Sequence, residues 1–123
     1  MTYRISKDFA FSASHVLEGL PEGHQCGRLH GHNYVVRVTL ESDVLDGHGF
    51  VVDYGDLKPF GAWLDAMCDH RHLNDVFDGQ PSAERMARQM ADVLLLLVPA
   101  VPDHVRVTVA VSETPKTWAE YRP

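Results

Sequence analysis

The chain has 123 residues, of which 45% are hydrophobic and 23% charged, and its net charge at neutral pH is −6. These values are ordinary for a globular protein, and the acidic balance argues against a protein that grips a phosphate backbone, which needs many lysines and arginines. The apolar run Val93 to Val98 is too short to span a bilayer, and the first residues lack a signal-peptide pattern. We therefore expect one domain, residues 1–123, in the cytoplasm, with Cys26 and Cys68 as reduced thiols.

Two strands are predicted in the first third of the chain. Polar and apolar residues alternate over residues 3–13 and again over residues 34–41, which is the period of a half-buried strand. We expect the two strands to pair antiparallel. Residues 16–29 between them contain Gly19, Pro21, Gly23 and Gly27, which predicts a long irregular loop of the kind that often carries function.

Two helices and two further strands follow. After a turn at residues 46–47 and the extended stretch FVVDYG, apolar residues recur at helical spacing and end near Asp69; they are Leu57, Phe60, Leu64 and Met67. Ser82 is the expected N-cap of a second helix that ends before Pro99. The segments HVRVTVAVSE and TWAEYR predict the last two strands.

This order of elements predicts an α+β fold, in which an antiparallel four-stranded sheet carries both helices on one face. Such a sheet has two open edges, which native proteins either protect or pair with another chain. We therefore expect a homo-oligomer.

Three histidines are expected to meet at one end of the sheet. Residues two apart on a strand share a face, so His30 and His32 lie on the apolar side of the second strand, and His15 lies on the apolar side of the first. Antiparallel pairing brings the end of one strand beside the start of the next. Burying three imidazoles is costly unless each finds a partner, and a zinc ion would serve all three.

The histidines have two other interpretations. Each could be a separate core histidine bonded to a backbone carbonyl, although three on one face favour a metal. A cupin-type site would place a carboxylate shortly after the second histidine, but residues 35–38 are VVRV and two helices do not suit an all-strand barrel. Spacing alone does not identify the metal.

Cys26, four residues before His30, has two possible roles. It could be the fourth ligand of a structural zinc site, or it could lie beside an open coordination position as a reactive thiolate, because a nearby cation lowers the pKa of a thiol. The spacing leaves both roles open.

Three other polar residues are candidates for chemistry. Asp69 lies at a helix C-terminus, where a carboxylate is disfavoured, so it could orient the adjacent His70, although a simple turn residue explains it about as well. Glu113 continues the apolar face of the third strand and could bind paired N–H groups of a ligand, or could be a solvated strand end. Glu84 fits the first turn of a helix. The remaining histidines are expected on the surface: His24, His48, His72 and His104.

Several motifs together resemble the 6-pyruvoyltetrahydropterin synthase family, and most closely its bacterial branch of 6-carboxy-5,6,7,8-tetrahydropterin synthases in queuosine biosynthesis. They are FSASH, CGRLHGHNY, VVDYGDLK, DHRHLN, PSAE and the terminal SETPKTWAEYRP, and they extend over nearly the whole chain. The resemblance implies a tunnelling fold with strand-strand-helix-helix-strand-strand order. It also implies trimers stacked into hexamers, with sites at chain interfaces.

The resemblance also implies roles for individual residues. Zinc would bind His15, His30 and His32, with Cys26 as the proton-abstracting thiolate and the pair Asp69–His70 as its partner. Glu113 would anchor the pterin ring, and Ser82 and Glu84 would help to hold it. Lys116 lies where the family has a small hydroxyl residue, and it joins Arg28 and Arg122 as candidate cations for a triphosphate.

The implied substrate is 7,8-dihydroneopterin triphosphate, a small molecule; neither nucleic acid nor membrane is an expected partner. In the queuosine branch the side chain is cleaved to acetaldehyde and triphosphate, leaving a 6-carboxy product. A pyruvoyl-type synthase that only eliminates triphosphate is the alternative enzyme. A non-catalytic, zinc-stabilised pterin-binding module is the alternative from another class.

Overall fold

The computed structural model describes all residues from Met1 to Pro123. Its strands are β1 (Tyr3–His15), β2 (His30–Ser42), β3 (Arg106–Ser112) and β4 (Ala119–Tyr121). Its α-helices are α1 (Lys58–Met67) and α2 (Ala83–Leu97), and short 3₁₀ turns are η1 (Gln25–Gly27), η2 (Tyr54–Leu57) and η3 (Leu73–Asp75). The predicted order of strands and helices is confirmed.

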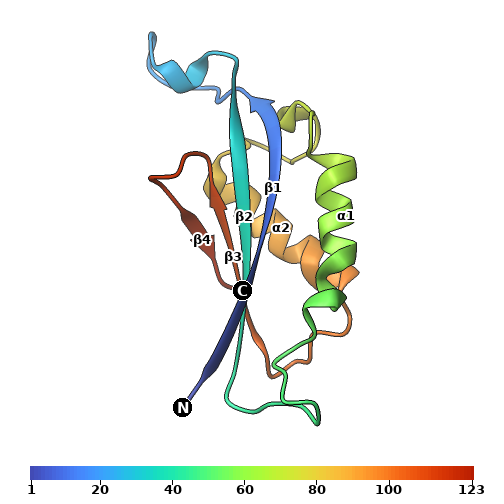
Figure 1. Ribbon diagram of the computed structural model, residues 1–123. Coiled ribbons are helices and arrows are strands. Elements are labelled where there is room, and N and C mark those ends of the chain that lie inside the picture. The colour runs from blue at the N-terminus through green and yellow to red at the C-terminus, as the bar shows by residue number, and fades with distance from the viewer.

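The four strands form one antiparallel sheet in the order β1-β2-β3-β4. β1 and β2 are its two long strands and pair from Tyr3 opposite Ser42 to His15 opposite His30. Both helices lie on the same side of this sheet, with α1 beside β1 and α2 behind β3 and β4 (Figure 1). The predicted fold class is therefore confirmed.

The core lies between the sheet and the helices. Alternate residues of β2 from Tyr34 to Leu40 are fully buried, as are Val109 and Val111 of β3. Helix α1 approaches β1 so closely that a Cβ at Gly61 would lie 2.9 Å from the Phe9 ring, so glycine allows this packing.

Helix α2 begins as the sequence predicted. The Ser82 hydroxyl accepts a hydrogen bond from the Arg85 N–H at 3.3 Å and so caps the helix. The end of α1 differs from the expectation. Met67 is 45% exposed, and the core position is taken by Cys68, which follows Leu64 by four residues at the helix C-cap. Burial raises the pKa of the Cys68 thiol to about 12, so this cysteine is a packing residue.

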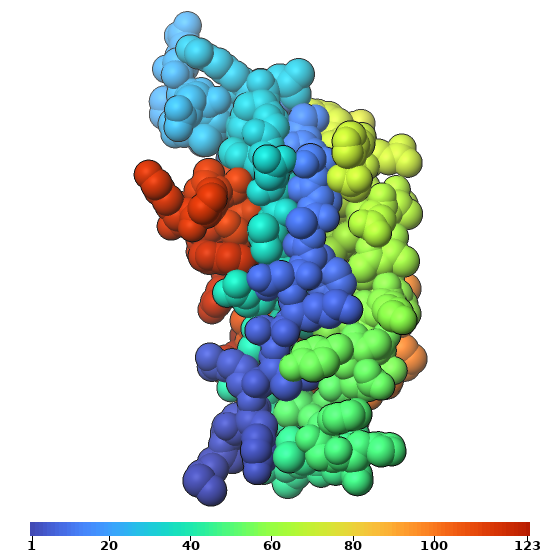
Figure 2. Space-filling view, in the orientation of Figure 1, coloured from blue at the N-terminus to red at the C-terminus, as the bar shows by residue number.

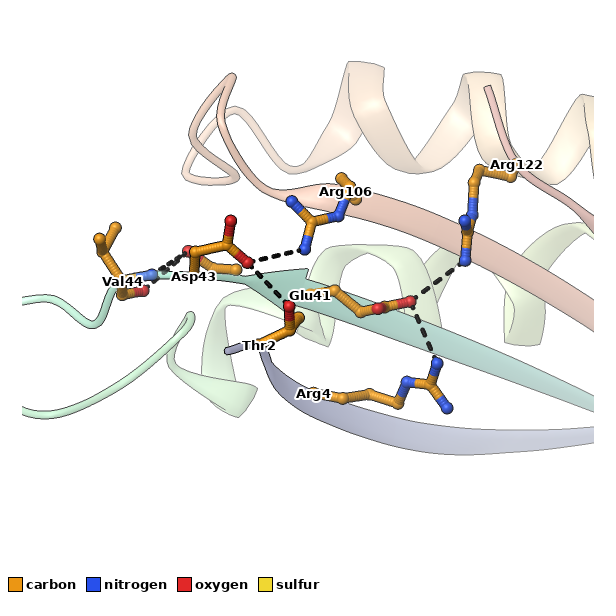
Figure 3. A network of polar contacts seen from close by, with 8 residues as sticks. Thr2, Arg4, Glu41, Asp43, Val44, Arg106 and Arg122 are labelled. Carbon is orange, nitrogen blue, oxygen red and sulfur yellow. Dashed lines mark hydrogen bonds and ion pairs between the residues drawn. The ribbon is translucent and has the colours of Figure 1, made fainter.

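A polar network occupies the end of β2 that lies away from His30. Figure 3 shows Arg4 and Arg122 directed at Glu41, with N–O distances of 3.5 and 3.2 Å, while Arg106 and Thr2 contact Asp43. These contacts tie the chain's two terminal segments to β2. No helix of the structure is long and apolar enough to cross a membrane.

Candidate metal and pterin site

Three imidazoles converge where the end of β1 lies beside the start of β2. His15 is opposite His30 in the strand register, and Ala13 is opposite His32, so all three rings face the same side. One nitrogen from each ring lies within 4.8 Å of the other two. A Cβ at Gly31 would lie 3.1 Å from the Ala13 carbonyl oxygen, so the close approach of the two strands favours glycine between the histidines.

The hydrogen bonds of two of these rings prepare them for a cation. His15 Nδ1 donates to the Pro81 carbonyl at 2.9 Å, and His30 Nδ1 donates to the Arg28 carbonyl at 2.6 Å, because a carbonyl can only accept. Each Nε2 of a neutral ring is then left with its lone pair, and the two Nε2 atoms face one another at 2.9 Å. Two lone pairs at this distance repel unless a cation lies between them, so the donor set fits a metal ion.

The third histidine completes this donor set. His32 Nε2 is buried without a hydrogen-bond partner; the Glu113 Oε2 is 3.2 Å away but outside hydrogen-bond geometry. Burial lowers the pKa of His32. The charge of Glu113 raises this pKa, and the neighbouring His15 and His30 lower it further. The ring is therefore held in the neutral form that binds a metal.

Glu113 reaches the site as its place on the apolar face predicted. It follows β3 at the end nearest the histidines, and its side chain is 24% exposed. A carboxylate so placed can contact a histidine on one side and a ligand on the other. Nearby lies the hydroxyl of Tyr34, a buried group that has no hydrogen-bond partner and that sequence reasoning missed. Burial, with a further contribution from Glu113, raises the pKa of Tyr34. The sequence pattern that could have indicated Tyr34 is the spacing of two residues that continues from His30 through His32 to Tyr34.

Cys26 lies in η1, in the loop between β1 and β2, and is half-buried. The loop projects beyond the sheet and stands away from the body of the molecule (Figures 1 and 2). Its base is closed by a hydrogen bond from the Leu17 N–H to the Cys26 carbonyl at 3.0 Å. The three-histidine group forms without Cys26.

Asp69 and His70 form a bonded pair at the free edge of β1. His70 Nδ1 lies 2.9 Å from Asp69 Oδ2, and the Ser12 N–H donates to Asp69 Oδ1 at 3.0 Å. The hydrogen bond from the Ser12 N–H holds the pKa of the Asp69 carboxyl below its ordinary value, and the bond to His70 contributes the next largest share. His70 has φ +56°, unlike any other non-glycine residue here, which costs of order 1–3 kcal/mol and persists only under strong local constraint. Its side chain is 84% exposed.

Comparison with known proteins identifies the family. A family model described as 6-pyruvoyl tetrahydropterin synthase matches residues 4–123. The chain belongs to this family. It is 32% identical to the 6-carboxy-5,6,7,8-tetrahydropterin synthase of Bacillus subtilis, over 99% of this chain and 86% of that protein. It is 33% identical to a putative enzyme of the same name from Archaeoglobus fulgidus, over 92% and 90% of the two chains.

Solved structures agree with this assignment. The 6-pyruvoyl tetrahydropterin synthase of Caenorhabditis elegans is 27% identical, with a TM-score of 0.81 over 100% of this chain and 96% of the other. The synthase from Plasmodium vivax shares the fold at 20% identity, also with a TM-score of 0.81, over 100% and 98% of the chains. The family resemblance drawn from the motifs is confirmed, and so is the expectation of an enzyme, because the named relatives are synthases.

The other expected site residues of this pterin synthase family member are scattered. Ser82 follows Pro81, whose carbonyl accepts from His15, so it lies near the metal group formed by His15, His30 and His32. Glu84 is exposed in the first turn of α2. Lys116 is exposed in the β3–β4 loop. Arg28 is exposed beside the histidines, since its carbonyl bonds His30.

Arg122 does not reach the histidines of its own chain. It is engaged with Glu41, nine residues beyond His32 along β2 and so about 30 Å from it at roughly 3.3 Å per residue. One expectation was wrong. His72 is not a free surface residue. It is half-buried, and its Nδ1 lies 3.0 Å from the Ser14 hydroxyl.

One main cavity of the single chain is remote from the histidines. It measures about 490 Å³ and lies near the opposite end of β2, with Phe50, Asp53 and His104 in its wall. The five main cavities of the chain are lined by residues other than His15, His30 and His32. The main cavities of a single chain therefore do not include the three-histidine group.

Proposed function

We propose that the chain is a zinc-dependent 6-carboxy-5,6,7,8-tetrahydropterin synthase of queuosine biosynthesis. It would convert 7,8-dihydroneopterin triphosphate to the 6-carboxy product, acetaldehyde and triphosphate. The observation that carries the proposal is the three-histidine group with paired Nε2 lone pairs, in a chain that matches a relative of that name over almost its whole length. Zinc bound by His15, His30 and His32 would act as a Lewis acid toward the side-chain hydroxyls of the substrate.

The chain's own residues divide the remaining work. Cys26 would take a proton from the substrate. Glu113 accepts the N–H groups of the pterin ring, and its position beside His32 joins the ring site to the metal site. Asp69 keeps its charge because of the Ser12 N–H and orients His70 to move protons. Ser82 and Glu84 hold the pterin, and Lys116 and Arg28 are cations for the triphosphate.

We further propose that the active enzyme is a trimer or hexamer with sites between chains. His70 is 84% exposed although its conformation is fixed, which suits a residue that completes its surroundings in an assembly. The location of the main cavities of one chain away from the histidines supports the same view. Mixing Cys26→Ala chains with His70→Ala chains tests this arrangement. Regained activity means that the two residues act from different chains, and no gain means that one chain supplies both.

Incubation with 7,8-dihydroneopterin triphosphate and identification of the products by mass tests the reaction. Acetaldehyde with a carboxylated pterin supports the proposal. A pyruvoyl pterin would instead support the second candidate, a 6-pyruvoyltetrahydropterin synthase, which the C. elegans likeness favours. Metal-loaded, folded protein that gives neither product would point to a non-catalytic pterin-binding module.

A further inference from the structure

A short segment lies along the free edge of β1 beside the metal group. The His70 N–H donates to the Ser12 carbonyl at 2.6 Å, and the Ser14 N–H donates to the Arg71 carbonyl at 3.1 Å. Ser14 and His72 form a parallel β-bridge. We call this segment, residues 69–72, the edge strap.

Packing fixes the two ends of the edge strap but not its middle. Cys68 before it and Leu73 after it are both fully buried. Arg71 and His70 are exposed, so hydrogen bonds to β1 must hold them in place. His70 adopts a φ of +56° within this turn, a backbone conformation that a side-chain-bearing residue rarely keeps without such constraint.

The edge strap also has one side-chain bond beyond the Asp69–His70 pair. His72 Nδ1 lies 3.0 Å from the Ser14 Oγ, in a part-buried position. Ser14 directly precedes His15, so this bond ties the strap to the part of β1 that carries a metal-group histidine. Loss of the bond leaves Cys68 and Leu73 anchored and removes one of the contacts that hold the turn between them to β1.

We propose that Ser14 and His72 are positioning residues. Their bond keeps the edge strap in register with β1 and so sets the direction of the His70 ring. The inference rests on the proposed function of His70. It assigns a role to the second histidine of DHRHLN, which lies outside the metal group.

The test uses full-length zinc-loaded enzyme and the variants His72→Ala, Ser14→Ala and the double variant. His104→Ala is the matched control, because His104 is an exposed loop histidine. We expect His72→Ala to lower kcat about ten-fold or more, with KM changed by less than about two-fold and zinc content unchanged. The double variant should lose no more kcat than His72→Ala, because each of the two changes removes the same bond between Ser14 and His72. His72→Asn, whose amide can still bond the Ser14 hydroxyl, should recover most of kcat.

A readout independent of turnover separates this proposal from the proposed function. In long-range ¹H–¹⁵N spectra, the His70 ring should show an Nδ1–H bonded to Asp69 in wild type and in His104→Ala, and should lose that signature in His72→Ala. Unchanged kcat and spectra in His72→Ala, or additive losses in the double variant, would overturn it. A lower Tm and zinc content with normal kcat per loaded site would also overturn it, since that is a purely structural role. If wild type has no turnover but His72→Ala still loses the His70 signature, only the proposed reaction is contradicted.

Discussion

Replacement of Tyr34 by Phe should make the metal-free protein more stable and the loaded enzyme less active. The Tyr34 side chain is fully buried and its hydroxyl has no hydrogen-bond partner. A buried hydroxyl without a partner costs about 1–3 kcal/mol relative to its solvated state. The ring stacks on Phe11 at 5.0 Å and 17°, and phenylalanine keeps this contact. The change therefore removes a cost and leaves the packing as it was.

The expected gain in unfolding free energy is about 1–3 kcal/mol, or about 4–12 °C in Tm at this chain length. Urea denaturation of EDTA-treated wild type and variant, at equal protein concentration, measures it. Tyr3→Phe is the matched control, because Tyr3 is 52% exposed and should change stability by less than about 0.5 kcal/mol. A destabilised Tyr34→Phe would refute the reasoning, since it would mean that the hydroxyl already has a partner. Unchanged turnover would show that the hydroxyl has no part in the site.

Three further predictions concern the cap of α2, the Asp69–His70 pair and the metal. Ser82→Ala should cost about 1 kcal/mol of stability through the lost helix cap, and it should also raise KM for the pterin substrate. A normal KM would mean that Ser82 caps the helix but does not bind the pterin. Asp69→Asn should lower Tm at pH 7 and approach wild type as pH falls below 3.8, because a folded-state pKa below that unfolded-state value gives stability that is present above 3.8 and is lost as pH falls through the folded-state pKa. Zinc added to EDTA-treated protein should raise Tm in proportion to log concentration, and His15→Ala should abolish the rise.

The sequence was sufficient for the sheet and the metal group because both follow from local alternation. A period of two fixes which face each strand residue takes, and one antiparallel pairing then brings His15 beside His30 and His32. The same alternation on β3 predicted that Glu113 lies on the side of the histidines, although the two are far apart in the sequence.

Positions that depend on packing at element ends were not predictable in this way. Whether Met67 or Cys68 enters the core depends on how the chain leaves α1, and helical spacing allows either. The fate of Arg122 depends on the pairing of β4, which places it beside Glu41. The bond from His72 to Ser14 arises where a loop returns to a strand edge, and periodicity contains no information about it.

Zinc content and turnover of Cys26→Ala, measured beside wild type and His30→Ala, test the central claim most directly. Wild type and Cys26→Ala should each retain about one zinc ion per chain, because the three histidines form the metal group without the thiol. Cys26→Ala should have lost turnover, and His30→Ala should have lost the metal. Loss of zinc from Cys26→Ala, together with a collapsed fold, would make the cysteine a fourth ligand and contradict the account.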